Sequence, residues 1–410
     1  MNRPSDEIEH LLRTEAPQVL GALVRRFGRF DIAEDAVQEA LLAATRAWTN
    51  GVPENPRSWL IRIGYRRMVD LLRSEQARRR REHESALAEP VRRGSAEPPS
   101  ETDDSLTLLL LCCHPALPAT SQVALTLRAV GGLTTTEIAH AYGATENTMG
   151  TRISRAKQQL AKAGARFTAP DDEDRADRVA AVMRVLYLIF NEGYTATAGD
   201  ALTRVDLTHE AIRLTRLLVA TLPDPEAIGL LALMLLTESR RTARTGPAGE
   251  LVPLEEQDRR LWDADLIREG TDLIDSIWNR GEPGQYQLQA AIAATHAAEG
   301  DTDWPQIAML YLWLERLTPT APIRLSRVVA VSQAYGPIRA LALLDDLNAR
   351  HGLDQDPLTR QRERAVRAHL VELTGDTATA AALYREAAAF TENQVEQRYL
   401  RAKAEGVHPS

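Results

Sequence analysis

Apolar residues recur at the spacing of an α-helix along nearly the whole chain, which leaves few folds open to it. One such run begins near the start, and its apolar positions are Ile8, Leu11, Leu12, Val19, Leu20, Leu23, Val24 and Phe27. Gly28 follows where a helix of this pattern ends. No stretch of residues 175–410 alternates with the two-residue period of a strand. The sequence therefore predicts an all-α fold.

Two stretches divide the chain into modules. Residues 89–104 collect three prolines, a glycine and five acids, and residues 170–174 read Pro-Asp-Asp-Glu-Asp. Such composition is typical of linkers and boundaries between domains. The modules that we expect are a small helical domain at residues 1–85, an acidic flexible linker at 86–105, a second small helical domain at 106–168 and a helical extension at 175–410.

Net charge is unevenly distributed between these modules. The chain carries 49 Lys and Arg against 57 Asp and Glu, a formal charge of −8. Residues 1–166 have a net charge of +3, whereas residues 167–410 have one of −11. The acidic total argues against a nucleic-acid-binding protein, but the division removes that objection for the first 166 residues.

Several classes of protein are disfavoured by the sequence. The longest apolar run, residues 227–236, is far shorter than the roughly 18 residues of a membrane span, and the start of the chain has no apolar signal segment. Cys112 and Cys113 are adjacent and have no second ligand pair nearby, so we expect buried apolar residues rather than a metal site. No Gly-rich phosphate loop or nucleophile elbow occurs. We expect a cytoplasmic protein that is not an enzyme and has no cofactor, metal or membrane partner.

The helix predicted over residues 57–81 carries nine arginines and two acids. At 100° per residue, four of the arginines fall within about 40° of one another: Arg62, Arg66, Arg73 and Arg80. A row of guanidinium groups suits a phosphate backbone, because each can form a bidentate hydrogen bond. Trp59 lies near the edge of the row, where an indole can stack on an unpaired base. A solvated basic face with a buried Trp59 is the alternative.

Residues 134–160 have the spacing of a helix-turn-helix. Thr134 and Glu137 form a capping-box pattern, Gly143 supplies a tight turn, and Thr145 can cap the next helix. In such a motif the first helix braces the second, which enters the major groove of DNA. A plain helical hairpin within an α bundle is the alternative.

These features occur in an order that resembles bacterial RNA polymerase sigma factors. DIAEDAVQEA (residues 31–40), NPRSWL (residues 55–60) and the arginine-rich helix resemble their second conserved region. The helix-turn-helix with RISRAK (residues 152–157) resembles their fourth region. The absence of the first and third regions resembles the extracytoplasmic-function class.

Three further motifs resemble one subgroup of that class, whose members have a long helical extension with tetratricopeptide-like repeats. They are LCCHPAL (residues 111–117), NEGY (residues 191–194) and QLQAAIA (residues 287–293). Gly300, Gly336 and Gly375 lie 36 and 39 residues apart, near the 34-residue period of such repeats. We expect residues 191–194 to form a locally capped turn. The aromatic residues that we expect in the core are His296, Trp304, Tyr311 and Trp313.

The resemblance implies a role for each matching residue. The residues that match the segment docking on the largest polymerase subunit are Asp31, Glu34, Asp35, Gln38 and Glu39. The residues expected to hold the −10 promoter element are Arg57, Trp59, Arg62, Arg66, Arg67, Arg73 and Arg80. The residues expected at the −35 element are Thr148, Thr151, Arg152, Ser154, Arg155 and Lys157. Among these, Thr151, Ser154 and Arg155 are expected at base edges, and Gly150 departs from the larger side chain of many family members.

The implied function is that of a promoter-specificity subunit, which binds core RNA polymerase and promoter DNA and helps to open the duplex. The alternatives are a helix-turn-helix regulator that binds duplex DNA without polymerase, and a helical-repeat scaffold. The acidic extension is expected to be a fused regulator or a second docking surface. Its intramolecular contact with the arginine row in the free protein is a further expectation.

Overall fold

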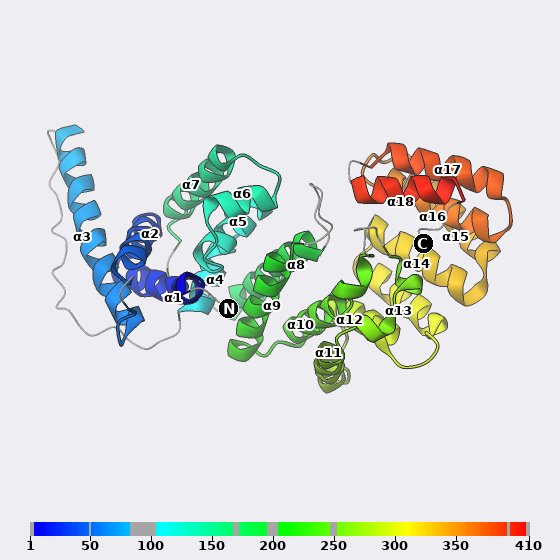
Figure 1. The fold of residues 1–410 in the computed structure, drawn as a ribbon, viewed down its shortest axis with the longest axis horizontal. Helices are drawn as coiled ribbons and strands as arrows, with labels where there is room; N and C mark the ends of the chain where they lie inside the picture. Colours follow the sequence, from blue (N-terminus) through cyan, green and yellow to red (C-terminus); the bar gives the residue numbers. More distant parts are fainter. Residues whose placement is uncertain are drawn as a thin grey trace. The chain divides into compact units, whose positions relative to one another are not determined.

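The computed structural model describes residues 4–48, 51–82, 104–165, 167, 172–194, 204–246, 252–391 and 394–406. Within these ranges the chain forms helices joined by turns and contains no strand, which confirms the all-α prediction (Figure 1). The chain divides into two compact units, Met1–Leu188 and Ile189–Ser410. No helix in the described ranges has the length and apolar content that crossing a bilayer requires.

Three helices open the first unit: α1 (Pro4–Phe27), α2 (Phe30–Ala47) and α3 (Pro56–Glu82). Leu23 of α1 and Leu60 and Met68 of α3 are buried in the core of this module, away from water. Gly64 allows α3 to approach α1, because a Cβ at this position would lie 2.9 Å from Leu23 Cδ1. The residues expected to dock on polymerase and those expected to hold the −10 promoter element therefore lie on a packed scaffold of three helices.

Four short helices follow: α4 (Ser105–Cys112), α5 (Ala119–Ala129), α6 (Thr135–Ala141) and α7 (Glu146–Lys162). The predicted capping box is confirmed, since Glu137 N–H donates to Thr134 Oγ1 at 3.1 Å and Thr134 N–H donates to Glu137 Oε2 at 2.7 Å. Gly143, with a φ of 58°, forms the turn. Thr145 caps α7 by accepting from Thr148 N–H at 3.2 Å. The helices and caps of the predicted motif are therefore present.

The boundary between the two units falls within α8 (Asp172–Tyr194). Arg178 on the first half of this helix donates from its Nη2 to the carbonyl oxygen of Leu110 at 2.9 Å. The helix that we expected to open the extension thus begins on the surface of the second small domain. Of the acidic segment at residues 170–174, which suggested the boundary, residues 170–171 lie outside the described residues and residues 172–174 form the start of α8.

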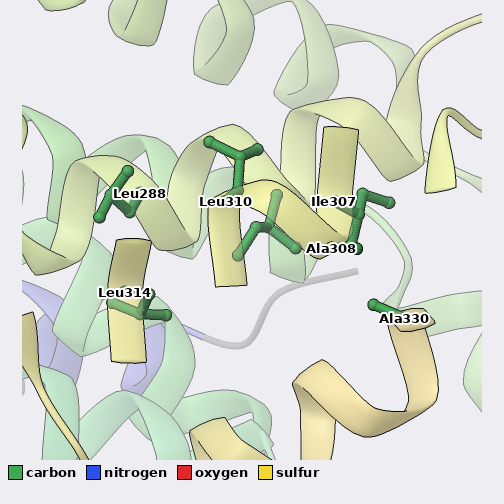
Figure 2. Close-up of a cluster of buried hydrophobic side chains, with 7 residues drawn as sticks. Leu288, Ile307, Ala308, Leu310, Leu314 and Ala330 are labelled. Atoms are coloured by element: carbon green, nitrogen blue, oxygen red, sulfur yellow. The ribbon is translucent and has the colours of Figure 1, made fainter. Parts of the chain in front are cut away.

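The second unit continues as a succession of helices (Figure 1). Its α-helices are α9 (Val205–Thr221), α10 (Pro225–Glu238), α11 (Ala264–Ile277), α12 (Gln285–Ala297), α13 (Trp304–Leu317), α14 (Ala321–Tyr335), α15 (Pro337–His351), α16 (Arg360–Leu373), α17 (Thr377–Ala389) and α18 (Gln394–Ala404). Short 3-10 helices occur at Arg241–Arg244, Leu254–Glu256 and Arg259–Leu261. Successive helices share local apolar clusters, and Figure 2 shows the cluster joining α12, α13 and α14.

Two of the subgroup motifs have structural explanations. Gln287 of α12 packs on α10 at Gly229, where an added Cβ would lie 2.8 Å from Gln287 N. The Glu226 carboxylate accepts hydrogen bonds from the backbone N–H groups of Tyr286 at 3.0 Å and Gln287 at 3.1 Å, and so caps α12. The NEGY motif forms the last turn of α8 rather than a separate turn, and the Tyr194 ring lies 3.6 Å from the Arg244 guanidinium.

The three glycines whose spacing suggested repeats occupy similar turns. Gly300, Gly336 and Gly375 connect α12 to α13, α14 to α15 and α16 to α17, with φ values of 82°, 89° and 92°. A positive φ favours glycine because it has no Cβ.

The expectation of a core Trp313 is wrong, since 41% of this residue is exposed. The side chain points outward because Leu310 and Leu314 already supply the buried face of α13.

Candidate nucleic-acid interface

The outer face of α3 carries an exposed row of arginines. Arg62, Arg66 and Arg73 are exposed, and no acidic partner engages them within the described ranges. Arg57 instead pairs with Glu15 of α1 at 2.6 Å. The side chain of Arg80 lies outside the described residues. Three neighbouring guanidinium groups thus remain available on this face to bind phosphates.

Trp59 lies at the start of the same helix and is half-buried. Its ring meets Trp48 edge-on, with the ring centroids 5.5 Å apart and the planes at 63°. Trp48 is 2% exposed, so it forms the inner member of the pair. The arrangement holds the Trp59 ring in a fixed position while leaving part of it accessible beside the arginine row.

The second helix of the helix-turn-helix, α7, has a polar outer face next to a surface hollow of about 880 Å³. The lining residues are Thr135, Glu146, Asn147, Gly150, Thr151, Ser154, Arg155 and Gln158. Of the residues predicted to contact the −35 element, Thr151, Ser154 and Arg155 are therefore together on one accessible face. Thr148 is exposed, but its hydroxyl lies 2.8 Å from the hydroxyl of the Thr145 cap. Arg152 is half-buried.

Two amides on this face were missed by the sequence interpretation. Asn147 and Gln158 line the same hollow as Thr151 and Ser154. The four positions follow one another at intervals of four, three and four residues, which is the helical spacing that could have identified them. Side-chain amides pair with the adenine edge in the major groove, so both residues extend the set available for base recognition.

Four of the five polar residues predicted to dock on polymerase are accessible on α2. Asp31 pairs with Arg29 at 2.8 Å, and Glu39 pairs with Arg67 of the arginine-rich helix at 2.9 Å. Gln38 is half-buried, and Asp35 keeps 63% of its side chain exposed. Ion pairs as exposed as that of Glu39 and Arg67 contribute little to stability, at most about 1 kcal/mol.

The fifth residue, Glu34, is buried at 4% exposure in a contact between α2 and the helix-turn-helix module. Its carboxylate accepts a 2.8 Å hydrogen bond from Arg128 Nε of α5 and another of 2.8 Å from Lys157 Nζ of α7. Lys157 also donates to Asp35 at 3.0 Å. The structure thus joins Glu34, which was expected to bind polymerase, to Lys157, which was expected to contact the −35 element.

The charges in this contact support one another. Burial alone would raise the pKa of the Glu34 carboxyl, but Lys157 and Arg128 outweigh burial and hold this pKa below its ordinary value. Burial likewise opposes the charge of Lys157, and the Glu34 carboxylate outweighs it and raises the pKa of the Lys157 ammonium. The Glu34 carboxylate and the Lys157 ammonium are therefore both ionised at neutral pH.

The second unit contains a hollow of about 340 Å³. Its walls include His296 and the aromatic residues Trp304, Tyr311 and Tyr399, and its charged lining includes Glu255, Glu256, Arg362 and Lys403. His296, Trp304 and Tyr311, which were expected in the core, are only half-buried.

The adjacent cysteines are fully buried, as expected. Burial raises the pKa of the Cys113 thiol to about 12, which keeps it protonated. Across the described part of the chain, no group of three His, Cys, Asp or Glu side chains is arranged to hold a metal ion.

Comparisons with known families cover most of the described helices. Residues 11–78 match the model of Sigma-70 region 2, and residues 107–160 match that of Sigma-70, region 4. Residues 178–278 match a family of unknown function, DUF6596. The resemblance of the first two modules to sigma regions is therefore confirmed, whereas tetratricopeptide-like repeats remain a prediction.

Two curated proteins are similar to the chain. "Uncharacterized protein R00370" of Rhizobium meliloti (strain 1021) is 42% identical over 411 residues, which cover 96% of this chain and 94% of that protein. "ECF RNA polymerase sigma factor SigE" of Mycolicibacterium smegmatis is 31% identical over 156 residues, which cover 37% of this chain and 59% of that protein. No solved structure matches the chain.

Proposed function

Because the chain belongs to the family of the Rhizobium meliloti protein and carries sigma-70 regions 2 and 4, we propose that it is a promoter-specificity subunit of bacterial RNA polymerase. In this function it binds core polymerase, recognises −10 and −35 promoter elements and helps to open the duplex. The observation that carries the proposal is the pair of accessible faces in one compact unit, the arginine row of α3 and the polar face of α7.

The chemistry of each face fits its DNA element. On α3, Arg62, Arg66 and Arg73 neutralise phosphates, and the neighbouring Trp59 ring stacks on an unpaired base. On α7, Arg155 reads guanine, the amides of Asn147 and Gln158 read adenine, and smaller polar side chains fill the spaces between them. These steps are binding and strand separation, with no covalent change in the DNA.

Polymerase docking is assigned to α2. Asp31, Asp35, Gln38 and Glu39 offer acidic and amide oxygens on one helix, and charge complementarity of this kind sets partner choice and association rate. The exposed apolar side chain of Leu42 lies one turn beyond Gln38 and supplies a hydrophobic contact at the same face. The proposal therefore needs a positively charged partner surface on polymerase.

The second unit is proposed to be a fused regulatory or docking domain. Its hollow beside Trp304 and Tyr311 supports a binding role, because aromatic walls with a few charged groups are typical of binding sites. A truncation that tests this role is best made after Tyr194, since α8 then keeps the Arg178 contact with Leu110. Promoter-specific transcription that is unchanged in level and regulation would refute the role.

The polymerase-docking assignment is tested by titrating the labelled chain with purified core polymerase. Glu39→Lys places a positive charge on the docking face and is expected to weaken binding at least tenfold. Glu54→Lys makes the same change at an exposed position after α2 and should alter binding less than twofold. Absence of saturable binding by the unaltered chain would overturn the proposed function.

A further inference from the structure

The hollow of the second unit is formed by elements that are distant in sequence but belong to one compact unit. Side chains of α13, α14, α16 and α18 line it, together with the 3-10 turn at Leu254–Glu256 and His296 near the end of α12. Its volume of about 340 Å³ lies at the lower end of the range found for small-molecule sites in proteins. The space therefore suits a small ligand.

The lining of this hollow carries charges of both signs. Arg362 and Lys403 are its cations, and Glu255 and Glu256 are its carboxylates. Among the described residues, no ion pair joins either cation to an acid or either carboxylate to a base. His296 adds no charge at neutral pH, because burial lowers the pKa of its imidazole to about 4. Positive and negative groups thus border one space without pairing with each other.

The two signs of charge are held at separate points along α14. Near the end of this helix, Gln333 Nε2 donates a 2.6 Å hydrogen bond to Glu255 Oε1. Near its start, Ser326 Oγ accepts a 3.4 Å hydrogen bond from Arg362 Nη2. Seven residues separate Ser326 from Gln333, which corresponds to about 10 Å along an α-helix. The hollow therefore has an acidic end and a basic end that are about 10 Å apart.

The rest of the lining is aromatic and apolar. It includes Trp304, Tyr311, Val329, Val366 and Tyr399. The Trp304 ring is held edge-on by the His296 imidazole, with the ring centroids 5.2 Å apart and the planes at 76°. Burial and the nearby carboxylates raise the pKa of Tyr399 to about 12, so its phenol stays protonated and can form hydrogen bonds with a peptide group.

We propose that this hollow binds a short free peptide of about three residues. Its terminal carboxylate pairs with Arg362, its terminal ammonium lies at Glu255 and Glu256, and its middle side chain packs on the Trp304 and Tyr311 rings. Three residues of extended chain reach about 10 Å, which matches the separation of the two ends.

Other ligand classes match these charges less well. A ligand with charge of one sign would bring like charges together at one end of the hollow, and such a juxtaposition opposes binding. A single amino acid carries its ammonium on the carbon next to its carboxylate, so the two groups are too close to reach both ends. A segment within a protein has neither terminal charge. A short peptide with both ends free satisfies the acidic and the basic end together.

The site deepens the regulatory role proposed for the second unit, on which it rests, by naming a peptide as the signal. Peptide binding is measured without polymerase or DNA. A chain that binds no peptide can still direct initiation, and a chain that does not direct initiation can still bind the peptide. The two outcomes therefore remain distinguishable.

Isothermal titration calorimetry on the full chain tests the site. The probes are two tripeptides with free ends, alanyl-leucyl-alanine and alanyl-phenylalanyl-alanine, each also prepared with an acetylated amino end or an amidated carboxyl end. We expect the free tripeptides to bind and either blocking group to weaken binding at least tenfold. Absence of binding by both free tripeptides would overturn the proposal, and so would equal binding of the free and blocked forms.

Variants of the two ends identify where the peptide lies. Arg362→Gln is expected to weaken binding at least tenfold and to remove the difference between the free and the amidated carboxyl end. Glu255→Gln combined with Glu256→Gln should weaken binding similarly and remove the difference between the free and the acetylated amino end. All three side chains are exposed, so we expect folded variants, as checked by circular dichroism.

Arg385→Gln is the matched control, since this arginine is exposed on α17 and does not line the hollow. It should change binding less than twofold. Variants that still distinguish free from blocked ends as the unaltered chain does would show that the peptide binds elsewhere, and this result would overturn the proposal.

Discussion

Lys157 on the recognition helix donates a 2.8 Å hydrogen bond to Glu34, a residue on the helix that matches the polymerase-docking segment. The sequence motifs assign Lys157 to a DNA phosphate and Glu34 to a protein surface, and the structure joins the two. Both assignments remain predictions. What the structure shows is that one buried ion pair joins the helix matched to polymerase docking to the recognition helix.

Arg155 is expected to contribute more to promoter recognition than a lysine on the same helix. Arg155→Ala should weaken binding to a duplex carrying the −35 element by about 1–3 kcal/mol and relax specificity at one base pair. Lys162→Ala, at the exposed end of α7, should weaken binding to all sequences similarly. Fluorescence anisotropy with matched and substituted duplexes at several salt concentrations makes the comparison. Equal losses on all duplexes for both variants would contradict base reading by Arg155.

Gly150 is expected to tolerate alanine. An added Cβ would meet only Thr135 Cγ2, at 3.8 Å, and alanine favours a helix interior over glycine by about 1 kcal/mol. Gly150→Ala should therefore stabilise region 4 by up to roughly this amount, as measured by chemical denaturation. A destabilised variant would show that the space next to α7 is filled.

Gly229 gives the opposite expectation, although it also lies in a helix. A Cβ there would come within 2.8 Å of Gln287 N and 3.0 Å of its Cα, and backbone atoms cannot easily move aside. Gly229→Ala should destabilise the second unit by about 1–3 kcal/mol, as overpacked core substitutions do. Denaturation of the chain followed by hydrogen exchange in α10 and α12 measures the loss, with Gly150→Ala as the control. Unchanged protection in these helices would refute the close packing.

His296 should remain neutral well below its ordinary range. Burial lowers the pKa of its imidazole to about 4, and the charges of Arg240 and Arg259 act in the same direction. An unfolded chain binds a proton at this residue near pH 6.5, so the stability of the second unit should fall as the pH decreases from about 6.5 to about 4, by at most ~3 kcal/mol. An NMR titration of His296 Cε1–H, assigned with His296→Gln, should have its midpoint near pH 4. A midpoint near 6.5 would contradict the buried environment.

The sequence predicted local features well because they depend on neighbouring residues. The capping box of Thr134 and Glu137 and the cap at Thr145 follow from short-range hydrogen bonding, and both are present. The apolar periodicity also predicted the helices of both small domains. The matches to sigma-70 regions 2 and 4 show that the motifs identified the right modules.

Contacts between modules could not be predicted in the same way. Glu34 has the pattern of an exposed helix position, and its burial depends on Arg128 and Lys157, which are distant along the chain. Trp313 was wrongly expected in the core because its position on the outer face of α13 depends on which neighbours pack there. The contact expected between the acidic extension and the arginine row remains a prediction.

Run-off transcription with purified core polymerase tests whether the chain is a promoter-specificity subunit. With genomic fragments as templates, we expect discrete transcripts that require both the chain and the core enzyme, and that decrease strongly with Arg66→Ala or Arg155→Ala. A chain that binds duplex DNA but gives no core-dependent initiation would contradict this function and favour a helix-turn-helix regulator. Promoter binding unaffected by either substitution would favour a helical scaffold.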